Sequence, residues 1–146
     1  MDLNGIVALK GQSGLFRIIS KMEYRIIVES LTDKRRMPYT DPFGITILDG
    51  LKFYGKYEDE DIMTVFKNIH DMEATHPIPE TKADNNTYKQ HFILVYPEYD
   101  EERLFVSDMK KIYLWYTILK DQINFDEINA ADDSEESSEE NTEAQN

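Results

Sequence analysis

The chain of 146 residues contains no cysteine, which excludes disulfide bonds and thiolate chemistry. A zinc site would therefore have to be built from His and carboxylate side chains alone. No stretch approaches the roughly 20 apolar residues that a membrane-spanning helix needs. The N-terminus also lacks the basic start and the long apolar run of a signal peptide. These absences predict a cytoplasmic protein without a membrane partner.

Basic residues are also scarce, since 16 Lys and Arg stand against 29 Asp and Glu, for a formal net charge of −13. Residues 126–146 hold nine of the acids and no Lys or Arg, which leaves 20 acids and a charge of about −4 for residues 1–125. The acidic end has too little apolar surface to offset the entropy of ordering, so we predict a disordered tail over residues 126–146. The overall charge opposes DNA at long range, so DNA is not an expected partner.

The stretch from residue 14 to residue 31 organises the first part of the chain. Two runs rich in Ile, Val and Phe flank a short break at residues 22–23, a pattern typical of a β-hairpin. Both strands are apolar on both faces, because Phe16 and Ile18 alternate with an equally apolar Ile19. A sheet with one face in water would alternate more cleanly. We therefore expect one face to line a small barrel and the other to be covered by a later segment.

Further short strands are expected on either side of this hairpin. The candidates are residues 5–11, 36–40, 45–48 and 51–54, separated by turns rich in Gly, Pro and Asp. Pro38 marks the second of them as an edge strand, since proline cannot donate to a ladder. About five short strands at this spacing predict a small SH3-like antiparallel barrel over residues 1–56. A single open meander is the alternative.

The apolar period changes after the last predicted strand. Spacings of three and four residues, which mark one face of a helix, connect Ile62, Val65, Phe66, Ile69 and Met72. The acidic run at residues 58–61 is expected in the first turn of this helix, where negative charge favours the helix dipole. Residues 74–86 contain two prolines and several polar turn formers, which predicts an exposed linker.

Two more helices are predicted after the linker. Thr87 is expected to cap the first of them, which Pro97 ends, and Ser107 is expected to cap the second. The last helix contains Trp115 on an apolar stripe that covers more than half of its circumference, so it should be central to the helical part. The predicted fold is α+β: an SH3-like barrel over residues 1–56, a three-helix segment over residues 57–125 packed on it, and the acidic tail.

Two blocks of the chain resemble a known family. The pattern GI-x-A-x-x-G-x-x-GL near the N-terminus and the pattern V-S-D-x-K-K at residues 106–111, followed by an aromatic run, are similar to short uncharacterised bacterial proteins found mainly in the Bacteroidota. That family is described as a domain of unknown function. The likeness extends over roughly residues 1–125. It implies a cytoplasmic protein with a barrel-like N-terminal half and a helical C-terminal half, and it implies no catalytic residues.

Motifs of catalysis and cofactor binding are missing from the chain. There is no GxGxxG, GxxxxGK[ST] or GxSxG, and Ser13 between two glycines has only part of a nucleophile turn. The three histidines, His70, His76 and His91, lack the spacing of a metal motif. The acidic runs at residues 57–61 and 98–102 lack the spacing of a calcium-binding loop. We therefore expect no enzyme, no cofactor and no metal site.

The densest basic cluster is formed by Lys34, Arg35 and Arg36, with Tyr39 close by. Small barrels with basic and aromatic surfaces often bind RNA through stacking and phosphate contacts. A solvated turn is the simpler interpretation. The acidic tail could instead fold over this basic side and compete with nucleic acid.

A second candidate surface is the block from residue 107 to residue 111. Besides capping a helix, it would place Asp108, Lys110 and Lys111 at a groove between barrel and helices. From these considerations we expect a non-catalytic binding or adaptor protein with a protein partner, with an RNA- or ribosome-associated protein as the alternative. The predicted binding residues are Lys34, Arg35, Arg36, Tyr39, Asp108 and Lys111.

Overall fold

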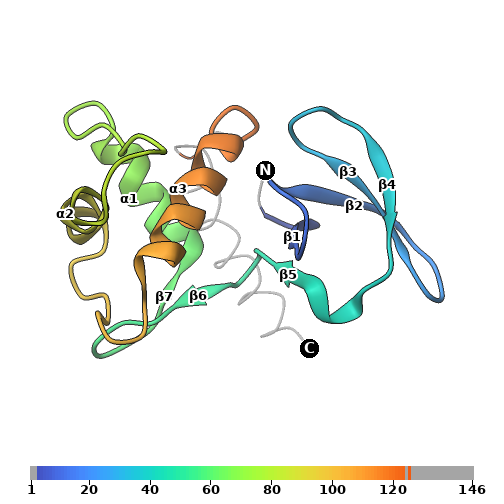
Figure 1. Cartoon of the computed structure of the whole chain (residues 1–146), viewed down its shortest axis with the longest axis horizontal. Helices are drawn as coiled ribbons and strands as arrows, with labels where there is room; N and C mark the ends of the chain where they lie inside the picture. The colour runs from blue at the N-terminus through green and yellow to red at the C-terminus, as the bar shows by residue number, and fades with distance from the viewer. Residues whose placement is uncertain (1–2, 124, 126–146) are drawn as a thin grey trace, which may run out of the picture.

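The structure, a computed structural model, describes residues 3–123 and 125, and it is an α+β fold in which a sheet lies beside three helices (Figure 1). The main sheet is antiparallel and has five strands in the order β4-β3-β2-β1-β5. Its strands are β1 (Ile6–Leu9), β2 (Phe16–Lys21), β3 (Ile26–Ser30), β4 (Arg36–Tyr39) and β5 (Ile45–Ile47). A 3-10 turn, η1 (Pro42–Gly44), leads into β5.

The expected use of both sheet faces is visible in two separate clusters of buried side chains. On one face, Val7, Leu9, Phe16 and Val28 pack together, with the side chains of β4 against them. The other face of β1, with Leu15 and Leu31 at the ends of the hairpin, contributes to a second cluster that also includes side chains of all three helices. The predicted cover of the second hairpin face does not extend to Ile19, which is 38% exposed and belongs to neither cluster. The alternation along each strand sends neighbouring residues to opposite faces, so an unbroken apolar run supplies both clusters.

The sheet does not close into the predicted barrel. Among the described residues, the strand order ends at β4 and at β5, and these two strands do not pair. The strand predicted at residues 51–54 was assigned to the wrong sheet. It is β6 (Lys52–Phe53), and it pairs with β7 (Glu60–Asp61) in a separate two-stranded sheet.

The helices are α1 (Ile62–Met72), α2 (Asn85–Val95) and α3 (Val106–Leu119). The expectation that residues 58–61 form the first turn of α1 was wrong. Asp61 precedes the helix as its N-cap, and its carboxylate accepts a bond from the Met63 backbone N–H at 2.8 Å. The acidic run therefore belongs to β7 and to the loop before it.

The predicted caps of the other two helices were also wrong by a few residues. Asp84, not Thr87, caps α2, since its carboxylate accepts the backbone N–H of Thr87 at 2.8 Å. Phe105 is the N-cap of α3, which places Ser107 inside the helix. The side chain of Asp108 reaches back to the Phe105 backbone N–H at 2.9 Å and satisfies a donor that the helix leaves free.

Sheet and helices share one apolar core. Leu15, just before β2, and Leu48, just after β5, belong to the same cluster as Phe66 of α1 and Tyr116 of α3, and each is essentially inaccessible to solvent. Figure 1 shows α3 as the helix next to the sheet. The predicted stripe of α3 faces this core, and Trp115 is almost fully buried.

Among residues 3–123 and 125, no helix is both long and apolar enough to cross a membrane. The predicted acidic tail, residues 126–146, lies outside the described residues.

Replacing Leu15 with Ala should lower the free energy of unfolding by about 2–5 kcal/mol, because it leaves a cavity between the sheet and the helices. Urea unfolding followed by far-ultraviolet circular dichroism and by the fluorescence of Trp115 would measure this loss. We expect the urea midpoints of both signals to fall together, because the sheet and the helices share one core. The matched control is Leu94→Ala, at a partly exposed position on α2, where the loss should be well under half as large. A Trp115 transition that does not move would contradict a shared core.

Candidate functional site

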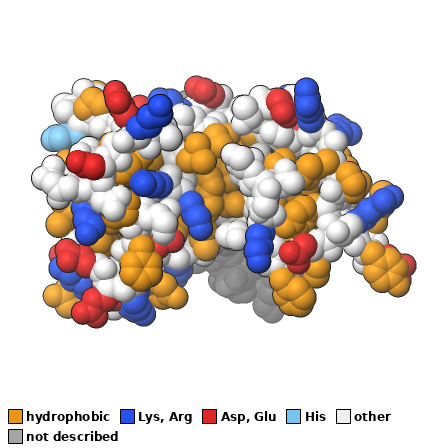
Figure 2. Space-filling model, viewed as in Figure 1, with side chains coloured by type: hydrophobic (Ala, Val, Ile, Leu, Met, Phe, Trp, Pro, Cys, Tyr) orange, Lys and Arg blue, Asp and Glu red, His pale blue; other side chains and the backbone are white. Residues whose placement is uncertain are grey.

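A groove of about 640 Å³ opens where α3 leaves the sheet. One wall is formed by the end of β1, the following loop and the residues around η1 and β5. The other wall is formed by α3, and Leu51 and Phe53, at the start and end of the segment that contains β6, also line the groove. Figure 2 shows hydrophobic side chains gathered between the helices and the sheet, with Lys and Arg side chains around them. The side chains that matter most below are Lys10, Phe43, Thr46, Asp108, Lys111 and Trp115.

The apolar part of the groove combines buried and exposed side chains. Trp115 is only 8% exposed, whereas Leu114 beside it is 47% exposed. Phe43 is 96% exposed, which is unusual for a large aromatic side chain. An exposed apolar surface beside a groove is typical of a protein-interaction site.

The charges of the groove are two lysines and one aspartate. No described residue forms an ion pair with Lys10 or Lys111, and both are exposed. Asp108 is half-buried, and one of its oxygens already accepts the Phe105 backbone N–H. The groove is therefore locally more positive than a chain of charge −13 would suggest.

The loop between β1 and β2 brings the sheet close to α3. Gly11 and Gly14 have φ values of +85° and +87°, in the left-handed region that favours glycine. A Cβ on Gly14 would lie 3.7 Å from the Ile118 side chain of α3. Ser13 sits in this turn as a lining residue of the groove, with no helix following it as a nucleophile turn would require.

Only two of the predicted binding residues, Asp108 and Lys111, lie in the groove. Lys110 does not line it, because its ammonium group lies 5.5 Å from the centre of the Tyr88 ring. Phe43 and Lys10 were not among the predicted site residues. An aromatic residue in a Pro-Phe-Gly turn was the one local signal for Phe43, since such a turn is expected at the surface.

The basic cluster lies elsewhere, in the turn before β4 and in its first residue. All three side chains are exposed, yet each has a neighbour. Arg36 pairs with Glu29 at 3.0 Å, Arg35 lies 4.0 Å from Asp33, and Lys34 contacts the Gln122 side chain at 3.4 Å.

The Tyr39 hydroxyl is not free, because it is hydrogen-bonded within the fold. Its hydroxyl donates to the Lys10 backbone carbonyl at 3.0 Å and so connects the ends of β4 and β1. A Cβ on Gly44 would collide with this hydroxyl, which explains the glycine at that position.

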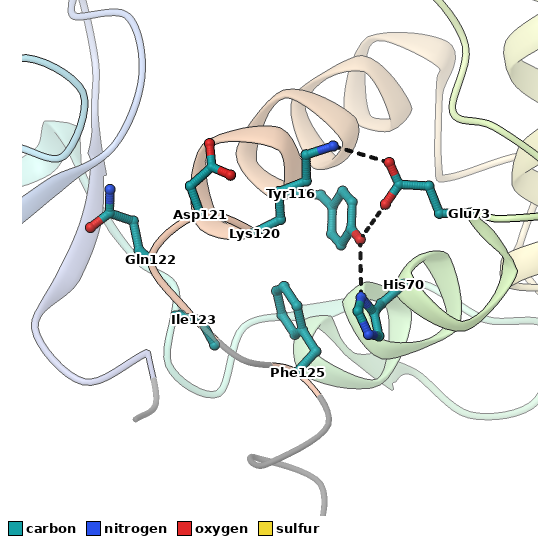
Figure 3. Close-up of a pocket in the computed structure, with 8 residues that line it drawn as sticks. All are labelled: His70, Glu73, Tyr116, Lys120, Asp121, Gln122, Ile123 and Phe125. Atoms are coloured by element: carbon teal, nitrogen blue, oxygen red, sulfur yellow. Dashed lines mark hydrogen bonds and ion pairs between the residues drawn. The ribbon is translucent and has the colours of Figure 1, made fainter.

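A second recess, of about 460 Å³, lies at the C-terminal end of α3. Figure 3 shows Tyr116 of α3 and Lys120, which follows α3, facing His70 of α1 and Glu73, which follows α1. The Tyr116 hydroxyl donates to Glu73 Oε1 at 2.7 Å, and Lys120 Nζ lies 3.0 Å from Glu73 Oε2. His70 Nδ1 is 3.4 Å from the same hydroxyl. These partners satisfy one another and join the two helix ends.

Burial and hydrogen bonding act in opposite directions on this cluster. Partial burial acts to raise the pKa of Glu73, but the bonds from Tyr116 and Lys120 outweigh it and lower that pKa below its ordinary value. Burial, followed by the bond to Glu73, raises the pKa of the Tyr116 phenol. Neither sequence spacing nor local pattern could predict this cluster, because Glu73 and Tyr116 are 43 residues apart.

The buried histidine, His91, is explained by packing. Its Nε2 lies 2.8 Å from the His76 carbonyl oxygen, which can only accept, so Nε2 carries the proton. Its Nδ1 then accepts the Tyr113 hydroxyl at 2.6 Å. In the described part of the chain, no three His, Cys, Asp or Glu side chains are grouped to hold a metal ion.

Comparisons with known proteins identify relatives but no activity. Residues 3–43 match the family "Domain of unknown function (DUF5606)", and residues 51–119 match "Domain of unknown function (DUF6852)". A structural genomics target from Bacteroides vulgatus, solved by solution NMR, is similar with a TM-score of 0.69 and 28% sequence identity, over 85% of this chain and 91% of that one. No curated protein matches the chain. The groove lies between the two matched segments, with lining residues from both.

Replacing Tyr116 with Phe should lower the free energy of unfolding by about 1.5–3 kcal/mol at neutral pH, because it removes a bond to a charged group. The folded pKa of Glu73 is depressed, so the contribution is present above the ordinary carboxyl pKa and is lost as the pH falls through the folded value. The loss of unfolding free energy caused by Tyr116→Phe, measured by urea unfolding, should therefore be smaller near pH 3 than near pH 7.

The matched control is Tyr88→Phe, whose hydroxyl donates to the Glu80 backbone carbonyl at 2.9 Å. A carbonyl does not titrate, so the loss of unfolding free energy caused by Tyr88→Phe should not depend on pH in this way. Equal pH dependence for the two variants would show that the Glu73 carboxylate does not account for the effect.

Proposed function

We propose that this chain is a non-catalytic adaptor whose protein partner binds in the groove. The chain belongs to this family of uncharacterised bacterial proteins, and its two matched segments meet at the groove. The observation that carries the proposal is Phe43, a large apolar side chain that is 96% exposed at the mouth of a groove. Aromatic side chains beside a pocket are frequent anchors of protein interfaces. We also propose a cytoplasmic location, since a chain without cysteine fits a reducing compartment.

The shape of the sheet supports the same proposal. We interpret it as an SH3-like barrel in which the open side is bridged by a side chain. In support, β1 pairs with both β2 and β5, and the 3-10 turn η1 precedes β5. The Tyr39 hydroxyl reaches the Lys10 carbonyl across the unpaired side. Small barrels of this kind often carry binding surfaces on their loops, and function on them belongs to the surface rather than to the fold.

The alternative is an RNA- or ribosome-associated protein that uses the exposed turn of Lys34, Arg35 and Arg36. The exposure of this turn favours it. Against it, Arg36 and Arg35 each lie near an acidic side chain, which offsets part of their charge. Nucleic-acid binding depends on uncompensated cations that displace counterions from phosphates.

Capture experiments with the full-length tagged chain would test the proposal in lysate of its own cells. Phe43→Ser and Lys111→Glu should each reduce the recovered partner by about tenfold or more, because they remove an apolar anchor or reverse a groove charge. Quantitative mass spectrometry, with nuclease present, would measure the loss.

Tyr24→Ser is the matched control, because Tyr24 is 82% exposed and lies outside the groove. Equal loss in the control, or none in the groove variants, would contradict groove binding. Recovered material that disappears with nuclease and with Arg35→Glu would favour the RNA alternative.

A further inference from the structure

The backbone of β5 leaves one edge of the sheet unpaired. Thr46 lies opposite Ala8 of β1. Two bonds flank this pair, from Lys10 N to Gly44 O (2.8 Å) and from Leu48 N to Ile6 O (3.1 Å). In an antiparallel ladder this pattern turns the N–H and C=O of Thr46 toward β1, and those of Ile45 and Ile47 away from it. The Ile45 N–H closes the last turn of η1, so the outward groups without a described hydrogen-bond partner are the Ile45 C=O and the N–H and C=O of Ile47.

The opposite edge of the sheet, at β4, lacks one outward backbone N–H donor. The bond from Ser30 N to Arg35 O (2.9 Å) shows that Arg36 and Pro38 have their backbone groups directed outward. Pro38 has no N–H, so this edge lacks a donor that an added strand would need. Proline on an edge strand is a common protection against pairing with another chain. β5 has no proline, so its edge remains competent to pair.

The side chains beside β5 indicate what an added strand would carry. Successive residues of a strand point to opposite faces. On the Thr46 face, every second side chain of an added strand would enter the groove, near Lys10 and Lys111. On the other face, its side chains would lie beside Ile47, which is 58% exposed. The surface therefore matches a segment in which acidic and apolar residues alternate.

We propose that the partner contributes an extended acidic segment that adds to the free edge of β5 as a sixth strand and lays its carboxylates into the groove. This rests on the proposed function and specifies its partner. Backbone bonds to Ile45 and Ile47 supply the affinity, and the lysines select acidic side chains. Both lysines lack an acidic partner among the described residues, so they meet a peptide carboxylate without first breaking an ion pair.

The test uses the full chain and the capped heptapeptide acetyl-Glu-Leu-Glu-Val-Glu-Leu-Glu-amide. Amide hydrogen exchange, followed by NMR, reads each backbone N–H separately. At saturating peptide, the Ile47 amide should exchange at least about tenfold more slowly, because it becomes a donor in the new ladder. The Thr46 amide, already bonded to β1, should change much less.

A pair of variants isolates the backbone donor. Ile47→Pro removes the outward N–H, and proline is tolerated at a position whose N–H faces solvent. Ile47→Thr keeps the N–H and is the matched control. The proline variant should bind the peptide about tenfold more weakly than the control. Retained protection of the Thr46 amide in both variants would show that β5 still pairs with β1.

Several results would overturn the inference. Peptide binding that leaves exchange at Ile47 unchanged would mean groove binding without strand addition, and the proposed function would survive. Equal affinity for the same peptide with Lys in place of Glu would overturn the acidic class. No binding at about 1 mM peptide, a concentration that detects even weak complexes, would also overturn it. Partner capture that depends on Phe43 would still stand in that case.

Discussion

The molecule depends on one constraint, which is that its sheet is apolar on both faces. One face closes on the small cluster around Val7 and Phe16, and the other would remain in water without the helices. Burying it against α1 and α3 removes that apolar area from solvent, and the helices bury their own stripes in the same contact. Each part therefore supplies the surface that the other part needs, which explains why the side chains of both form one core.

The groove is a consequence of this packing. A straight helix can follow a twisted sheet only over part of its length, so a wedge opens where the two diverge. Trp115 lines the wedge from α3, and Phe43 and Gly44 line it from the turn before β5. The same turn also has a structural role, because Gly44 leaves room for the Tyr39 hydroxyl that connects β4 with β1. Phe43, between a proline and this glycine, is left exposed by a turn whose shape is already determined.

Features encoded locally could be predicted from the sequence, and those that depend on distant residues could not. The strands at residues 16–21 and 26–30 and the stripe of α3 follow from the period of their own side chains. The pairing of Lys52–Phe53 with Glu60–Asp61 has no apolar pattern, so it was missed. Asp108 and Lys111 were predicted because they sit together at the start of a helix. Lys10, which completes the charge of that groove, lies about a hundred residues earlier.

An acidic partner is compatible with an acidic chain because electrostatic fields in solution are short-ranged. At physiological ionic strength an exposed charge is screened over about 8 Å. A segment bound at β5 would therefore sense Lys10, Lys111 and Asp108 more strongly than the net charge of −13. One oxygen of Asp108 is already engaged by the Phe105 backbone N–H, which offsets part of its repulsion. The net charge then governs solubility and the rate of encounter, while the charges of the groove govern which segment stays bound.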